Sequence, residues 1–129
     1  RALSRWPEVD EERNALVKLW PEEPQGHVDL QLDEQTRLTV VCGVAFDGIQ
    51  ASPHTFDAWY LDGFAPARNP DMWSIEIMTA LFDKTAEGGS FATYAAAGFV
   101  RRNLIAAGFN LERRKGFAGK REMLCGTKR

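Results

Sequence analysis

Cysteine, histidine and long apolar runs are all scarce in this sequence. It holds two cysteines, Cys42 and Cys125, and two histidines, too far apart for the spacing of a metal site. Both cysteines stand in apolar, strand-like runs, which predicts buried free thiols in a reducing compartment rather than a disulfide. No apolar run approaches the ~20 residues of a membrane span. We therefore expect no metal, no membrane partner and a cytoplasmic location.

The chain shows no signal peptide and begins with Arg1 rather than Met. We therefore expect a piece of a longer protein or a processed form, whose upstream residues could carry a targeting signal. Its 129 residues fit one domain with a hydrophobic core. The composition, 44% hydrophobic and 26% charged, is ordinary for a soluble globular protein.

Positive charge is concentrated at the C-terminal end of the chain. Residues 101–129 hold nine Lys and Arg against two Asp and Glu, whereas residues 1–100 hold seven against sixteen. The net charge of the whole chain is only −2, so the asymmetry is hidden in the total. A basic end permits contact with a polyanion such as nucleic acid, and a solvated surface of mixed charge is the alternative.

The pattern of apolar and turn residues predicts strands that alternate with helices. Strands are expected at 27–32, 36–42, 56–61, 90–94, 109–114 and 121–126, and helices at 8–20, 70–86 and 97–107. A loop with a short helix is expected at 43–54. Asn69 and Pro70 are the start signal of the middle helix, and Gly88 with Gly89 predicts a turn after it. Gly108 is expected to end the last helix.

This alternation indicates βαβ units, so we expect an α/β fold with a mainly parallel sheet. The uniformly apolar run at 56–61 is typical of a buried parallel strand. About six residues join the last two strands, which is too short for a parallel crossover, so these strands must form an antiparallel hairpin. A parallel sheet with such a terminal hairpin is typical of the end of a class I, Rossmann-like methyltransferase sheet, and other α/β folds end in a similar way.

The most informative residues stand where the expected strand at 56–61 ends. Leu61, Asp62, Gly63 and Phe64 follow one another there, and ligands bind at the carboxyl ends of strands in open α/β sheets. Gly63 lets the backbone approach a ligand closely. A carboxylate in this place can orient a substrate and accept a proton, and a loop-capping role for Asp62 is the alternative. The Phe64 ring could stack on a nucleobase or pack the loop onto the sheet.

Three ordered motifs carry a resemblance to a known family. The first is the run from Asp57 to Trp73, which contains Asp-Gly-Phe-Ala-Pro-Ala-Arg-Asn-Pro-Asp-Met-Trp. The second, at 88–102, contains Gly-Gly-Ser-Phe-Ala-Thr-Tyr and Ala-Gly-Phe-Val-Arg-Arg. The third, at 115–126, reads Lys-Gly-Phe-Ala-Gly-Lys-Arg-Glu-Met-Leu-Cys-Gly. Together they resemble the MnmC methyltransferase family, whose domain forms methylaminomethyl groups on the wobble uridine of tRNA.

The resemblance implies N-methylation of an aminomethyl group on tRNA, with S-adenosyl-L-methionine as cofactor and tRNA as partner. It places the family's catalytic aspartate at Asp62, with Leu61 and Gly63 beside the cofactor. The residues expected to contact substrate or RNA are Phe64, Arg101, Arg102, Lys120 and Arg121. Some family members are fused to a flavin-dependent (FAD) oxidoreductase that processes the same uridine side chain. We therefore expect that second activity in a fused or separate partner.

Two parts of the family pattern are absent from these residues. The Gly-rich strand–loop–helix that cradles S-adenosylmethionine, with its acidic ribose ligand, is not present, and Val44 follows Gly43 where the family often has an aspartate. We therefore expect residues 1–129 to be a single, partial methyltransferase domain that alone binds the cofactor weakly or not at all. The alternative is a remnant that binds RNA or a partner without catalysis.

Overall fold

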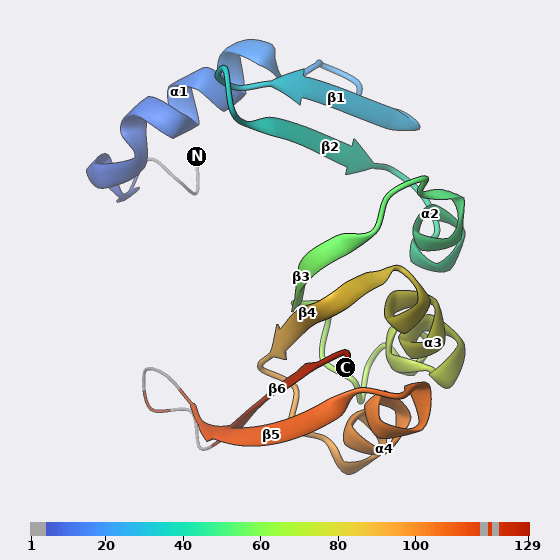
Figure 1. Cartoon of the computed structure of the whole chain (residues 1–129). Coiled ribbons are helices and arrows are strands. Elements are labelled where there is room, and N and C mark those ends of the chain that lie inside the picture. The colour runs from blue at the N-terminus through green and yellow to red at the C-terminus, as the bar shows by residue number, and fades with distance from the viewer. Residues whose placement is uncertain (1–4, 117–118, 120–121) are drawn as a thin grey trace. The chain divides into compact units, whose positions relative to one another are not determined.

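The chain divides into two compact units, each with its own sheet (Figure 1). The computed structural model describes residues 5–116, 119 and 122–129. The first unit is Arg1–Val44 and the second is Ala45–Arg129. Among the residues described, no helix has the length and apolar character needed to cross a membrane.

In its described residues, the first unit contains two short helices followed by a β-hairpin. Its elements are the 3-10 helix η2 (Pro7–Val9), α1 (Asp10–Leu19), β1 (His27–Gln31) and β2 (Arg37–Val41). The hairpin is antiparallel, and its turn is closed by Asp33, whose Oδ1 accepts hydrogen bonds from the N–H groups of Gln35 and Thr36. The bond from Gln35 is the main reason that the pKa of Asp33 lies below its usual value. The predicted helix and hairpin are thus confirmed.

The second unit combines a four-stranded sheet with three α-helices. Its elements are α2 (Ala45–Ala51), β3 (Phe56–Leu61), the 3-10 helix η3 (Pro70–Trp73), α3 (Ile75–Asp83), β4 (Thr85–Thr93), α4 (Gly98–Ala107), β5 (Asn110–Lys115) and β6 (Glu122–Thr127). Figure 1 shows α2, α3 and α4 on the same face of this sheet. The predicted α/β class and the short helix after β2 are confirmed.

The sheet is mixed rather than mainly parallel. Its strand order is β3-β4-β6-β5, and within the described residues only the β3–β4 pair is parallel. The prediction of a mainly parallel sheet is therefore wrong, because β6 pairs antiparallel with both β4 and β5. The terminal hairpin is confirmed, but its second strand inserts between β4 and β5. Composition explains this order, since the centre of β6 at 123–125 is apolar while β5 is charged at 112–115, which suits an edge.

Strand β3 lies at the other edge of the sheet, so the prediction that it is buried is wrong. Trp59 and Leu61 pack against the core on the helix-covered face. Ala58 and Tyr60 point to the opposite face and are exposed, Tyr60 to 87%. A continuously apolar strand predicts cover on both faces, but the three helices cover only one.

The segment after β3 does not form the single helix predicted at 70–86. Pro70–Trp73 is a 3-10 turn, and Ser74 has extended backbone before α3 begins. Ser74 caps α3, because its Oγ accepts a hydrogen bond from the N–H of Ile77 at 3.3 Å. Asn69 makes no side-chain cap hydrogen bond, so its prediction as the N-cap is wrong. Both residue types are good caps, and the extended Ser74 backbone decides which one is used.

Strand β4 begins at Thr85, earlier than predicted, and passes through Gly88 and Gly89. The predicted turn at these glycines is replaced by a bulge within the strand: Phe56 pairs with Thr85 but Ala58 pairs with Ser90, and Gly88 has a φ of 77°. Gly89 serves close packing instead, since an added Cβ atom would lie 2.7 Å from the Thr85 methyl group and 2.8 Å from the Ala86 carbonyl oxygen. Two adjacent glycines in the sequence indicated a backbone constraint, but not that Gly89 is required by close packing within β4.

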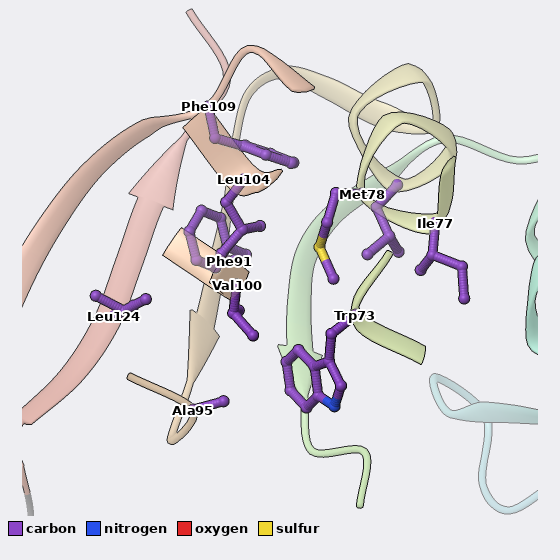
Figure 2. Close-up of a cluster of buried hydrophobic side chains, with 10 residues drawn as sticks. Trp73, Ile77, Met78, Phe91, Ala95, Val100, Leu104, Phe109 and Leu124 are labelled. Atoms are coloured by element: carbon purple, nitrogen blue, oxygen red, sulfur yellow. The ribbon is translucent and has the colours of Figure 1, made fainter. Parts of the chain in front are cut away.

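The hydrophobic core of this unit lies between the sheet and helices α3 and α4 (Figure 2). Its buried members are Trp73, Ile77, Met78, Leu81, Phe91, Ala95, Val100, Leu104, Phe109 and Leu124. The Phe109 ring meets Phe82 and Phe91 edge-on, at centroid distances of 5.0 and 4.9 Å. Phe82 also packs on Gly108, which ends α4 with a φ of 116° as predicted. This core fixes β4 and α3, the elements next to the end of β3.

Both cysteines are free, but neither is buried as predicted. Cys42 is exposed just after β2. Cys125 is half-buried on β6, where it lines the same shallow face of the sheet as Tyr60 and Ala92. The apolar runs beside the two thiols do form strands β2 and β6. Among the described residues, however, no element buries either thiol.

Candidate active site

A cavity of about 340 Å³ opens at the C-terminal end of β3. Strand β3 and helices α2, η3 and α3 contribute its mostly apolar walls. It is lined by Ile49, Trp59, Tyr60, Leu61, Asp62, Gly63, Met72, Trp73, Ile77, Met78 and Leu81. The structure therefore brings three predicted site residues, Leu61, Asp62 and Gly63, together in one cavity.

Asp62 supplies the carboxylate among the residues that line the cavity. It is exposed, and within the described part of the chain its carboxylate makes no hydrogen bond or ion pair. This leaves its oxygens available to a ligand. Gly63 follows directly, and a Cβ atom built there would be 3.5 Å from the Trp73 indole, so this ring lies directly against the loop. Among the described residues, no hydrogen bond supports the alternative that Asp62 caps the loop.

Three side chains hold the loop after β3 through its backbone carbonyl groups. The donors are Thr93 Oγ1 to Leu61 O at 2.8 Å, Tyr94 Oη to Gly63 O at 2.6 Å, and Trp73 Nε1 to Phe64 O at 2.8 Å. Sequence reasoning did not select these donors as site residues. A signal existed, because Thr93 and Tyr94 end the next strand and neighbouring parallel strands end at the same edge.

Phe64 is 81% exposed and does not line the cavity. Its ring therefore does not pack onto the sheet, which was the alternative to nucleobase stacking. The carbonyl group of Phe64 is held by Trp73, while its ring stands in solvent two residues after Asp62. An exposed ring in this place can stack on a base.

Arg101 and Arg102 are both exposed in the N-terminal half of α4. The next residue, Asn103, donates a hydrogen bond from Nδ2 to the Trp73 carbonyl at 2.8 Å. The middle of α4 therefore lies against Trp73, which lines the cavity. Lys120 and Arg121, the other two predicted RNA contacts, lie outside the described residues.

Comparison with known protein families identifies one whose sequence pattern matches nearly all of this chain. Residues 7–129 match the family described as S-adenosyl-L-methionine-dependent methyltransferase. The chain belongs to this family. Because the match spans almost every residue, it includes the cavity at the end of β3 and all of the predicted site residues.

Two relatives carry the name tRNA 5-methylaminomethyl-2-thiouridine biosynthesis bifunctional protein MnmC. The one from Chromohalobacter salexigens is 41% identical over 126 residues, which are 98% of this chain and 18% of the relative. The one from Ectopseudomonas mendocina is 44% identical over 127 residues, 98% of this chain and 19% of the relative. The resemblance to the MnmC methyltransferase domain is confirmed. The chain spans about a fifth of the length of these relatives.

The fold is similar to the crystal structure of MNMC2 from Aquifex aeolicus. The TM-score is 0.71 at 24% sequence identity, and the match covers 88% of this chain and 35% of that chain. At this identity the similarity concerns the fold alone. It agrees with an α/β unit built on a mixed sheet.

Proposed function

We propose that the chain is the C-terminal half of a methyltransferase domain that methylates the aminomethyl group on the wobble uridine of a tRNA. The observation that carries the proposal is the cavity at the end of β3, where the exposed Asp62 carboxylate stands among apolar walls. The family assignment supports S-adenosyl-L-methionine as the cofactor. The names of the two MnmC relatives support a tRNA uridine as the substrate.

The finer fold assignment belongs to the same proposal. We place the second unit in the C-terminal part of a class I, Rossmann-like sheet, and residues 1–129 in one partial domain. The parallel β3–β4 pair and the antiparallel hairpin after α4 support this placement, as does the similarity to MNMC2.

Asp62 acts on the substrate amine. A primary amine attacks a methyl group only when it is neutral, so a nearby group must accept its proton. The Asp62 oxygens are exposed beside the cavity and unpaired within the described residues, so they can orient the amine and hold that proton. S-adenosyl-L-methionine, when bound, supplies a methyl group activated on a positively charged sulfur.

The residues that line the cavity fit one part of this cofactor. Apolar walls from Ile49, Leu61 and Met78 suit its hydrocarbon and aromatic portions, and Gly63 allows close approach to the backbone. Asp62 is the single carboxylate among the lining residues, so a separate acidic ligand for the ribose is lacking there. Among the described residues, no group of three or more His, Cys, Asp and Glu side chains could hold a metal ion.

The RNA contacts surround this cavity in the proposal. The exposed Phe64 ring stacks on a base next to the reacting uridine. Arg101 and Arg102, on the turn of α4 that Asn103 ties to Trp73, contact phosphates. Lys120 and Arg121 lie outside the described residues, and their charge in the sequence is the reason to propose them as further phosphate contacts.

The test is methyl transfer by the full-length protein. The protein is incubated with S-adenosyl-L-methionine and tRNA that carries aminomethyluridine, and the digested nucleosides are separated by mass. The proposal expects methylaminomethyluridine to appear in proportion to enzyme and time. Absence of that nucleoside, with folded protein and intact tRNA, contradicts it.

A second candidate is an RNA-binding or partner-binding module without catalysis. The observation that favours it is Val44, which is 68% exposed and stands where the family often has a carboxylate. Retained tRNA binding without any methyl transfer would support this module over the enzyme. We assign oxidation of the uridine side chain to a flavin-dependent domain, fused or separate, which agrees with the word bifunctional in the relatives' names.

A further inference from the structure

Asp62 is the one residue in its loop whose two chain neighbours are both held from outside. The carbonyl of Leu61 accepts from Thr93 Oγ1 at 2.8 Å, and the carbonyl of Gly63 accepts from Tyr94 Oη at 2.6 Å. These contacts fix the backbone on both sides of Asp62. The carboxylate itself makes no hydrogen bond or ion pair within the described residues, so its position depends on this backbone.

The donors are themselves rigidly placed. Thr93 is 3% exposed and pairs directly with Leu61 in the parallel β3–β4 ladder. Its hydroxyl also accepts a hydrogen bond from the Ala95 N–H at 3.1 Å, so both its donor and its acceptor are used. Tyr94 meets the buried Trp73 ring edge-on at 6.3 Å. Trp73 in turn donates to the Phe64 carbonyl at 2.8 Å, which extends the hold to the residue after Gly63.

We propose that Thr93, Tyr94 and Trp73 are positioning residues that hold the Asp62 carboxylate at the substrate amine through the carbonyl groups of its loop. This inference rests on the proposed function. Because the Asp62 carboxylate has no hydrogen bond of its own among the described residues, the precision of its position is set by the precision of its backbone. Since a shift of about 1 Å in a reacting group can cost a hundredfold in rate, three hydrogen bonds to one short loop have a catalytic consequence.

The first test replaces Thr93 in the full-length protein. Thr93→Val keeps the shape and removes the hydroxyl, whereas Thr93→Ser keeps the hydroxyl. We expect Thr93→Val to lower kcat for methyl transfer by roughly ten- to a hundredfold, with little change in the KM for tRNA. Thr93→Ser should recover most of that loss. Tyr94→Phe, which keeps the ring, should give a smaller loss of kcat and carries the test if Thr93→Val does not fold.

Thr85→Val is the matched control. Thr85 is a buried threonine at the opposite end of β4. Its hydroxyl donates to the Leu81 carbonyl at 2.6 Å and accepts from Trp59 Nε1 at 2.9 Å, so, like that of Thr93, it both donates and accepts, but neither bond reaches residues 61–64. Thr85→Val therefore removes a hydroxyl of similar burial from the same strand, far along β4 from the Asp62 loop. We expect it to lower Tm without lowering kcat.

Two further readouts separate positioning from stability. Amide hydrogen exchange at residues 62–65 should speed up in Thr93→Val and Tyr94→Phe, but not in Thr85→Val. In the Asp62→Asn background, Thr93→Val should cause no further loss of kcat, because both changes act on the same group. Three results would each overturn the inference. The losses of kcat from Asp62→Asn and Thr93→Val could add up in the double variant, or kcat for both Thr93→Val and Tyr94→Phe could stay within about twofold of wild type. The third is unchanged amide exchange in the loop.

The inference and the proposed function fail in different ways. If Asp62→Asn lowers turnover while Thr93→Val and Tyr94→Phe do not, only the positioning role is refuted. If Asp62→Asn itself has full turnover, the proposed role of Asp62 is refuted, and the positioning role with it.

Discussion

Gly126 lets β6 lie in the middle of the second sheet, and its replacement by alanine tests that arrangement. An added Cβ atom would lie 2.4 Å from the carbonyl oxygen of Asn110 on β5 and 2.6 Å from Cε1 of Phe91 in the core. Carbon atoms pack comfortably only at about 3.5 Å or more. Either the strand or the Phe91 ring must therefore move by about 1 Å.

Overpacking of this kind in a dense core typically costs about 1–3 kcal/mol. For a domain of this size, each kcal/mol lowers Tm by roughly 4–8 °C. We therefore expect Gly126→Ala to lower Tm by roughly 5–20 °C. Thermal unfolding of the 129-residue chain, followed by tryptophan fluorescence, measures this, since Trp59 and Trp73 both belong to the second unit.

Gly43→Ala provides the control, because a Cβ atom there meets no atom within 4 Å. We expect its Tm to stay within about 2 °C of wild type. If Gly126→Ala melts at the same temperature as Gly43→Ala, β6 does not lie against Phe91 and β5 as described. The strand order β3-β4-β6-β5 would then be refuted.

Three further outcomes are expected. Ser74→Ala should destabilise the second unit by about 1 kcal/mol in urea unfolding, because it removes the cap of α3. Asn69→Ala should have almost no effect on stability. Equal losses of stability in the two variants would contradict the assignment of Ser74 as the cap. The 129-residue chain should bind S-adenosyl-L-methionine weakly or not at all in calorimetric titration, and micromolar affinity would contradict the partial-domain proposal. The affinity for tRNA should fall steeply as the salt concentration rises, and the double variant Arg101→Glu/Arg102→Glu should show a weaker dependence on salt. An affinity that changes neither with salt nor in the double variant would exclude Arg101 and Arg102 as phosphate contacts.

Much of the second unit could be predicted from local sequence signals. Gly108 predicted the end of α4 because a left-handed residue there favours glycine, and the short connection before β6 predicted an antiparallel hairpin. Asp62 was selected from its place after an apolar strand, and it lines the cavity at the end of β3, while its catalytic role stays a prediction. These features depend on a few neighbouring residues, so the sequence suffices for them.

The features that could not be predicted depend on partners far away in the chain. The exposure of Tyr60 depends on which face of the sheet the helices cover, and the apolar run around it does not contain that information. The position of β6 between β4 and β5 depends on the relative polarity of two strands. The end of β4 pointed to the neighbourhood of Thr93 and Tyr94, but not to their hydrogen bonds, because the partners Leu61 and Gly63 lie about thirty residues earlier.

The measurement that tests the central claim most directly is single-turnover methyl transfer by Asp62→Asn in the full-length protein. The substrate is tRNA that carries aminomethyluridine, and thermal melting checks that the variant is folded. We expect the rate to fall roughly 10²-fold or more with little change in Tm, because Asn keeps the shape of Asp62 but loses the proton acceptor. Asp71→Asn, an exposed carboxylate in η3 outside the cavity lining, should keep its rate. A folded Asp62→Asn protein with a near-normal rate would contradict the account.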